Sequence, residues 1–334
     1  MTRVTSQNRE QGFTIVELMV AMVLGLLMGG AIVTVFVENR HSFDRDEDVL
    51  RMQDDARQAI RELVNDVSMA GFWADLVLPA AIFPDASLAV ATDCGPAGAV
   101  DWIYQTVTPG TDESLAIESV DNATGATASA AFSCIDPAEI LPGTDVVAIK
   151  RLAGARAPAV SLVDTVYLRT NGTMGLLFRE PEAAPPAVSI PAPFVEWEYR
   201  PSIYYIRRFA VVPDDAVPTL CRKVLQYSSP PTVVTECLAQ GIENFQIEFG
   251  LDTDGDGEPN VFLPNPTLAE LQTAVSARLF LLARTVDRDT RYTNDKTYQL
   301  SNAPAYAPAD NFNRRVFSIA VGMRNLSSLR KMRT

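Results

Sequence analysis

A long apolar run near the start of the chain dominates the hydrophobic pattern. Residues 18–37 contain no charged side chain, and this length matches the ~20 apolar residues that a transmembrane helix needs. Glu17 comes directly before the run. A carboxylate at membrane depth costs on the order of 2.5 to 3.5 kcal/mol, so it is kept where it pairs with another group or serves a function. The pattern therefore predicts a membrane helix whose Glu17 needs a partner.

Other kinds of N-terminal segment fit this run less well. A secretory signal has an apolar core of only about 7 to 15 residues followed by a cleavage site of small residues, and neither is present. A lipoprotein signal ends at a Cys, whereas the first cysteine of this chain is Cys94. A simple membrane anchor with Glu17 at the cytoplasmic interface stays open, but it leaves the residues around Glu17 unexplained.

A second pattern extends the helix beyond the membrane run. Apolar residues recur at steps of three and four, which is the period of one helix face. These residues are Val49, Met52, Ala56, Ala59, Leu63, Val67 and Ala70. Charged residues such as Asp54 and Asp66 are assigned to the opposite faces, and Gly71 is a candidate C-cap. We expect a membrane half over 13–38 and an amphipathic half over 39–71, the latter lying on a globular head.

The rest of the chain, 72–334, predicts a β-rich head. Residues 72–142 are rich in small and turn-forming residues, so we expect irregular structure with short strands there. Later runs of Val, Ile, Tyr and Phe predict strands. The candidate strands are 144–150, 165–169, 195–207, 219–227, 242–249, 274–285 and 315–321. Five prolines between positions 181 and 193 predict a long loop.

Charge narrows the range of partners. The chain has 41 acidic and 28 basic residues, a net charge of -13. An acidic surface does not favour sequence-independent binding to phosphate backbones, so nucleic acid is not an expected partner. A local basic patch stays open at the C-terminal end, although a solvated tail is the favoured interpretation. Its residues are Arg324, Arg330, Lys331 and Arg333.

The residue types needed for common catalytic sites are scarce. His41 is the single histidine and lies on the long helix, so Ser-His-Asp and Cys-His catalysis lack their base. The sequence has no glycine-rich loop of the nucleotide-binding type. A pair of acids could serve a hydrolase, but nothing selects one pair, and we expect no enzyme.

The cysteines predict disulfide bonds. Cys94, Cys134, Cys221 and Cys237 all follow the membrane run, and none forms a C-x-x-C motif. An even number of cysteines in an oxidising compartment indicates two disulfides, for which four cysteines allow three connectivities. We favour the sequential pairs, because each closes a loop rich in turn residues. Free buried thiols are the alternative.

An acidic loop, "DTDGDGEPN", is the candidate metal site. Asp252, Asp254 and Asp256 alternate, and the glycines between them permit a tight turn, as in the first half of a calcium loop. The candidate ligands are Asp252, Asp254, Asp256, the carbonyl of Glu258 and Asn260. Leu263 stands where an EF-hand has its closing Glu. We therefore expect a helix-free Ca²⁺ loop completed by water or a distant acid; a solvated acidic turn is the alternative.

The segment "GFTIVE" resembles the type III signal of prepilins and pseudopilins. A short leader, 1–12, with two arginines precedes it, and the apolar run follows. The resemblance implies that a prepilin peptidase cuts after Gly12, that Phe13 becomes the methylated N-terminus, and that Glu17 pairs with the new amine of a neighbouring subunit. The basic leader predicts a cytoplasmic N-terminus. The head then faces the periplasm.

Later segments resemble the PilW family of type IV pilus minor pilins, which is related to J-type pseudopilins. The segments are "DDARQAIRELVNDVSMAGFW", "SIYYIRR", "TLCRKVL", "GIENFQIEFGLDTDGDG", "ARLFLLART" and "RRVFSIAVGMRN". The family implies a pilin-like α+β fold, in which the long N-terminal helix packs on an antiparallel sheet with loop-rich insertions.

This resemblance implies a minor pilin that primes pilus assembly at or near the tip and supports twitching motility and adhesion. Expected partners are other minor pilins, the major pilin, the prepilin peptidase and, before assembly, the inner membrane; a tip adhesin is a further candidate. Two alternatives stay open. The head could be a calcium-dependent binding module at the tip that contacts an adhesin, a surface or DNA, or the chain could be a pseudopilin of type II secretion.

Overall fold

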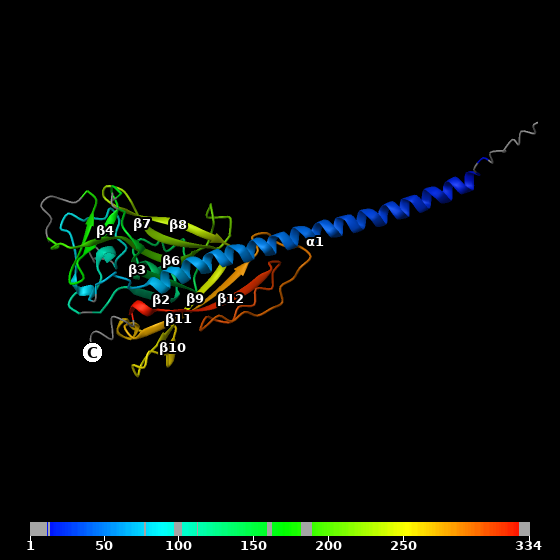
Figure 1. The fold of residues 1–334 in the computed structure, drawn as a ribbon. Helices are drawn as coiled ribbons and strands as arrows, with labels where there is room; N and C mark the ends of the chain where they lie inside the picture. Colours follow the sequence, from blue (N-terminus) through cyan, green and yellow to red (C-terminus); the bar gives the residue numbers. More distant parts are fainter. Residues whose placement is uncertain are drawn as a thin grey trace, which may run out of the picture. The chain divides into compact units, whose positions relative to one another are not determined.

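The computed structural model describes residues 12, 14–76, 78–96, 102–111, 113–158, 162–181 and 189–326. It divides into two compact units, Met1–Leu50 and Arg51–Thr334. Most of the leader 1–12, the expected N-terminal residue Phe13 and the basic residues at 330–333 lie outside the described residues. The helices and strands of the second unit can be followed in Figure 1.

The helix α1 covers Ile15–Met69 and confirms the long N-terminal helix. It begins at a capping box: the Glu17 N–H donates to Thr14 Oγ1 (3.2 Å), while the Thr14 N–H donates to Glu17 Oε2 (3.1 Å). Its N-terminal part is long and apolar enough to cross a membrane, and none of that apolar window is buried. Just past the last helical residue, Gly71 has a φ of +71°, a backbone conformation that glycine adopts without strain.

The second unit contains two sheets. The eight-stranded sheet has the order β1-β5-β4-β6-β3-β2, and β7 joins β6 to β8. Its strands are β1 Ile82–Pro84, β2 Ile117–Ala123, β3 Thr144–Arg156, β4 Val166–Thr170, β5 Gly175–Arg179, β6 Val195–Arg207, β7 Thr219–Gln226 and β8 Thr232–Gln240. All of its pairings are antiparallel except that of β1 with β5.

The four-stranded sheet is antiparallel, with the order β10-β9-β11-β12. Its strands are β9 Ile242–Leu251, β10 Val261–Leu263, β11 Ala274–Arg284 and β12 Arg314–Gly322. Short helices occupy the connections: η1 Pro79–Ala81, η2 Trp102–Tyr104, α2 Gly125–Ala131 and α3 Leu268–Leu271. The antiparallel sheets after a long apolar helix confirm the predicted α+β class.

Each of the seven predicted strands is present, with bounds that differ by a few residues. The strand predicted at 195–207 is β6 without any shift, whereas the strand predicted at 144–150 extends to Arg156 in β3. The prediction missed three strands outside 72–142. These are β5 at 175–179, β8 at 232–240 and β10 at 261–263. Within 72–142 the structure has β1, β2 and α2. The two short strands agree with the prediction, whereas the helix α2 was not predicted.

The apolar stripe of α1 forms part of the core of the second unit. Met52, Ala56, Ala59, Leu63 and Val67 are all buried, as their spacing predicts. Burying such side chains stabilises a fold by roughly 25 cal/mol for each Å² of apolar surface removed from water. The stripe therefore accounts for why this half of the helix packs into the unit instead of remaining in solvent.

The placement of Asp66 on an outer face of the helix was wrong. Its side chain is buried with 2% of its surface exposed. Arg151 donates to Asp66 Oδ1 from Nε (2.9 Å) and Nη2 (2.5 Å), while Ser202 Oγ (2.9 Å) and Tyr204 OH (2.7 Å) donate to Oδ2. These four hydrogen bonds offset the cost of burying the carboxylate. They also join α1 to β3 and β6.

Both disulfides in the structure are the sequential pairs that the sequence favoured. Cys94 is bonded to Cys134, and Cys221 to Cys237. The second bond joins residues directly opposite each other on β7 and β8. No free cysteine is present, and all four positions lie in the described part of the chain. The Cys221–Cys237 bond therefore links the two strands of the β7–β8 hairpin, and the Cys94–Cys134 bond links residue 94 to the turn that follows α2.

Asp145 connects the two sheets. This residue of β3 accepts hydrogen bonds from the backbone N–H of Asn122 on β2 (2.8 Å) and of Ile247 on β9 in the other sheet (2.7 Å). Its side chain is buried, and burial raises its pKa from 3.8 to about 7, although the two hydrogen bonds act in the opposite direction. The folded protein therefore binds a proton at Asp145 more tightly than the unfolded chain does.

This shift predicts a pH dependence of stability. Because the folded pKa is raised, the contribution of Asp145 to stability is present below pH 4 and is lost as the pH rises toward about 7. We expect wild type to lose on the order of 2 kcal/mol more than Asp145→Asn between pH 5 and pH 8. Urea unfolding at both pH values measures the difference. Parallel pH profiles for the two proteins would contradict the prediction.

Candidate functional site

The acidic loop lies between β9 and β10. It covers 252–260 and is held at both ends by backbone hydrogen bonds: the Asp252 N–H donates to Thr273 O, and the Asn260 N–H donates to Leu251 O, each at 2.9 Å. The strands on either side pair antiparallel, with Val261 opposite Leu251. The loop therefore connects the two paired strands of a β-hairpin and is anchored at both of its ends.

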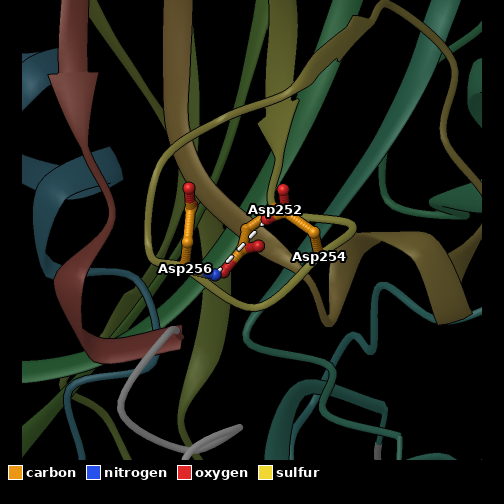
Figure 2. A group of neighbouring side chains, drawn as sticks. All are labelled: Asp252, Asp254 and Asp256. Atoms are coloured by element: carbon orange, nitrogen blue, oxygen red, sulfur yellow. Dashed lines mark hydrogen bonds between the residues drawn. The ribbon is translucent and has the colours of Figure 1, made fainter.

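The structure brings the three predicted aspartates together. Asp252, Asp254 and Asp256 each offer a carboxylate oxygen, and these oxygens lie within 4.8 Å of one another. Figure 2 shows the three side chains around the inside of the loop. Two oxygens that bind one Ca²⁺ ion at about 2.4 Å are at most about 4.8 Å apart. The spacing therefore fits a single shared cation.

Asp252 organises the loop. Its side chain is 3% exposed, whereas Asp254 and Asp256 are exposed. Asp252 Oδ1 accepts from the Gly255 N–H (2.5 Å), and Oδ2 accepts from the Gly257 N–H (3.0 Å). Both glycines have positive φ values, +89° and +96°, which other residues rarely adopt. The alternating Asp-Gly spacing is thus explained by the geometry of the turn, with or without an ion.

Asn260 is placed differently from the expected ligand. Its Oδ1, the atom that would bind a cation, accepts from the Thr253 N–H (2.8 Å) and Thr253 Oγ1 (3.1 Å). Its Nδ2 donates to Asp254 Oδ2 (3.1 Å). In this conformation Asn260 closes the loop and stabilises the Asp254 carboxylate. Ligation through its side chain would require the amide to turn and both contacts with Thr253 to be lost.

A Ca²⁺ ion bound in this loop would take its other ligands from outside the three aspartates. The Glu258 N–H donates to Asp256 Oδ1 (2.8 Å), and a ligand role for its carbonyl stays a prediction. Leu263 lies in β10 opposite Phe249, so the closing position of an EF-hand is occupied by a strand here. Ca²⁺ takes six to eight oxygen ligands. Three carboxylates therefore leave several positions for water.

The N-terminal signal forms a second candidate site. Gly12, Thr14 and Glu17 are exposed. Glu17 Oε2 accepts from both the N–H and the Oγ1 of Thr14, each at 3.1 Å. The role of Thr14 was not predicted, although T-x-x-E before an apolar run is the sequence signature of a capping box. Glu17 therefore has a local role at the start of the helix besides the expected pairing between subunits.

Comparisons with known proteins agree with these features. The family model described as Type IV Pilus-assembly protein W matches residues 203–325, and the Prokaryotic N-terminal methylation motif matches residues 7–33. No curated protein and no solved structure matches the chain. The two matches confirm the resemblances drawn from "GFTIVE" and from the segments after 203. The first match covers β9 to β12 and the acidic loop.

Proposed function

We propose that this chain, a PilW-type protein with a prokaryotic N-terminal methylation motif, is a minor pilin that primes assembly of the type IV pilus at or near its tip. The observation that carries the proposal is the combination of the processing motif at 7–33, an apolar helix that begins in the motif, and a PilW region at 203–325. Twitching motility and adhesion then depend on this protein through the filament.

The location follows from the same features. The methylation motif and the apolar N-terminal part of α1 fit a membrane-anchored pilin. In our proposal the prepilin peptidase removes 1–12, the helix holds the protein in the inner membrane, and the disulfide-bonded head lies in the periplasm before assembly. Two disulfides in the second unit support an oxidising compartment. The pilus match also supports a structural role over a catalytic one.

The direct test is deletion of the gene in the source organism. A minor pilin that primes assembly should leave few or no surface pili and reduced twitching when it is absent. Electron microscopy of the cells and an agar motility assay measure the two outcomes. Normal pili with lost attachment would favour a binding module at the tip. Normal pili with a loss of protein secretion would favour a type II pseudopilin.

Glu17 provides a sharper prediction, because its charge can be separated from its capping role. Glu17→Gln keeps an oxygen for the Thr14 N–H, so the capping box is retained, but it removes the charge that would pair with the amine of a neighbouring subunit. We expect normal membrane insertion, since a neutral side chain costs less at that depth. Incorporation into pili should fall by about tenfold, which corresponds to about 1.4 kcal/mol.

Quantitative blots of sheared pili and of membranes measure the incorporation of Glu17→Gln. Glu47→Gln, on the same helix but beyond the apolar run, is the matched control and should assemble normally. Glu17→Ala, which loses both the charge and the cap, should be at least as defective. Wild-type levels of Glu17→Gln in pili would show that the cap, and not the charge, is what assembly requires.

The acidic loop supports a calcium-dependent head as a second proposal. Three carboxylate oxygens within 4.8 Å of one another repel in the absence of a cation. An ion that binds the folded loop alone stabilises the protein by mass action. Few protein ligands imply weak affinity, on the order of 10⁻⁴ to 10⁻³ M, as in extracellular modules. External calcium can fill such a site.

We expect millimolar Ca²⁺ to raise the melting temperature of the detergent-solubilised protein by about 3 to 8 °C relative to chelator. Asp254→Ala removes an exposed carboxylate of the group and should abolish the rise. Asp295→Ala, an exposed acid outside the group, is the control and should keep it. Equal melting temperatures of wild type with and without Ca²⁺ would make the loop a solvated turn.

A further inference from the structure

A pocket of about 670 Å³ lies in the second unit, beside the ends of β9 and β11. Its lining comes from five separate segments, including the loop before β3, the β6–β7 connection and the loop that precedes β12. Figure 1 shows the strands that border it. Small-molecule sites have volumes of about 300 to 1,000 Å³. The pocket is therefore large enough for a ligand of several residues or a small organic molecule.

Part of the pocket wall is apolar. Pro142, Pro218 and Pro304 come from three different loops, and Leu282 of β11 also lines the pocket. Proline has no backbone N–H, so these three residues offer apolar contact but do not donate to a ligand. The polar side chains that line the pocket are Arg208, Glu243, Asn244, Arg284 and Tyr306.

Arg284 is the first of the two arginines that line the pocket. Its Nη2 donates to the backbone oxygen of Ala216 (2.5 Å), and its guanidinium lies over the ring of Phe312, 4.1 Å from the centroid. Its Nε is buried and has no hydrogen-bond partner in the described part of the chain. Burial lowers the pKa of Arg284 from its usual value. Arg284 lines the pocket, so its guanidinium charge favours an anionic ligand there.

The nearby acids are already paired with another arginine. Arg314, directly opposite Arg284 on β12, donates to Glu243 from Nε (2.5 Å) and Nη2 (2.9 Å). Arg314 also donates to Asp310 from Nη1 (2.5 Å) and Nη2 (2.7 Å). Tyr306 OH donates to Glu243 as well (3.1 Å). These bonds occupy the carboxylates, and among the described ion pairs none includes Arg284.

A second arginine lines the same pocket. Arg208 is exposed and donates from Nε to Ile140 O (2.7 Å). Its backbone N–H donates to Glu139 O (2.8 Å), and its Nη1 and Nη2 make no hydrogen bond within the described residues. The guanidinium group matches carboxylates in geometry and charge. Two arginines beside partly apolar walls therefore favour a ligand that is anionic at one end and apolar elsewhere.

We propose that this pocket binds a carboxylate carried on an apolar body, with Arg284 and Arg208 as the groups that recognise the anion. The chemistry is shared by a small organic acid and by the C-terminus of an apolar peptide. The inference rests on the contacts of the pocket and does not depend on the role of the protein in the pilus. It also differs from the acidic loop, whose chemistry selects a cation.

The test uses the detergent-solubilised full chain and two matched pairs of probes. The first pair is 4-phenylbutyrate and 4-phenylbutyramide; the second is acetyl-Ala-Pro-Leu with a free or an amidated C-terminus. Calorimetric titration with each probe at up to about 20 mM detects dissociation constants as weak as the millimolar range. We expect at least one free acid to bind about tenfold more tightly than its amide.

Variants of the two arginines test whether the acids bind in this pocket. Arg284→Gln should weaken binding of the acid by about tenfold, and Arg208→Gln, an exposed position, should weaken it without a risk to folding. Arg278→Gln is the matched control, because Arg278 lies on the same strand, outside the pocket, over the ring of Phe262 (3.5 Å). Circular dichroism checks that each variant is folded.

The outcomes separate the sources of the carboxylate. Binding of phenylbutyrate alone supports a free organic acid as the ligand, and binding of the peptide alone supports the C-terminus of another protein. The proposal is overturned if neither acid binds, if the amides bind as tightly as the acids, or if Arg278→Gln weakens binding as much as the two pocket variants do.

Discussion

Replacing Asp66 by Ala should lower the free energy of unfolding of the head by about 3 to 5 kcal/mol, because it leaves a buried cation without its partner. Arg151 is 6% exposed and donates two hydrogen bonds to Asp66. Ser202 and Tyr204 lose their acceptor as well. The loss is large because Arg151, Ser202 and Tyr204 are all buried.

Urea unfolding with the disulfides intact, followed by tryptophan fluorescence, measures this loss. Asp54→Ala is the matched control, since Asp54 lies on the same helix in an exposed pair with Arg57 (3.4 Å), and exposed pairs contribute little. The double variant Asp66→Leu with Arg151→Met should recover much of the stability, because an apolar pair can replace a buried ion pair. A change in Asp66→Ala no larger than in Asp54→Ala would contradict the importance of the network.

Replacing Gly12 by Val should abolish processing, so that residues 1–12 stay on the protein and no variant enters pili. The expectation comes from the methylation motif at 7–33. The folded chain itself gives no reason for a defect, because Gly12 is exposed and a Cβ built there meets nothing within 4 Å. Any loss should therefore come from recognition by the peptidase.

Intact mass of the protein from native membranes measures the cleavage. The matched control is Gly25→Ala, inside the apolar part of α1, where an added Cβ is equally unhindered; it should be processed normally. Wild type should begin at Phe13, with one added methyl group. A mature mass for Gly12→Val, or a retained leader in wild type, would contradict the assignment of the cleavage site.

Local pattern was sufficient for several elements of this protein. The steps of three and four between positions 49 and 70 identified residues that are buried in the second unit, and the run rich in Val, Ile and Tyr at 195–207 is β6. The helix start at Thr14 and Glu17 carries a sequence signature as well, although it was not predicted. These features were accessible because helix and strand periods and caps involve residues that are close in sequence.

Shorter strands were beyond the reach of local pattern. β5, Gly175–Arg179, is buried at four of its five positions, so it shows no alternation of apolar and polar residues. β1 has three residues and is defined by its parallel pairing with β5. Such strands are stabilised mainly by the neighbours they pair with, and local preference is a weak guide to them.

The sequence by itself determined the long apolar N-terminal helix with its methylation motif, the α+β class, seven of the strands after position 144 and the alternation of the acidic loop. The tertiary structure alone decided that Asp66 is buried, that Asn260 turns its oxygen to Thr253, and that Arg284, whose Nε has no hydrogen-bond partner among the described residues, lines a pocket. The physical reason is distance along the chain. The partners of Asp66 lie 85 to 138 positions away, and no local period records which side chains meet when the sheets and α1 pack together.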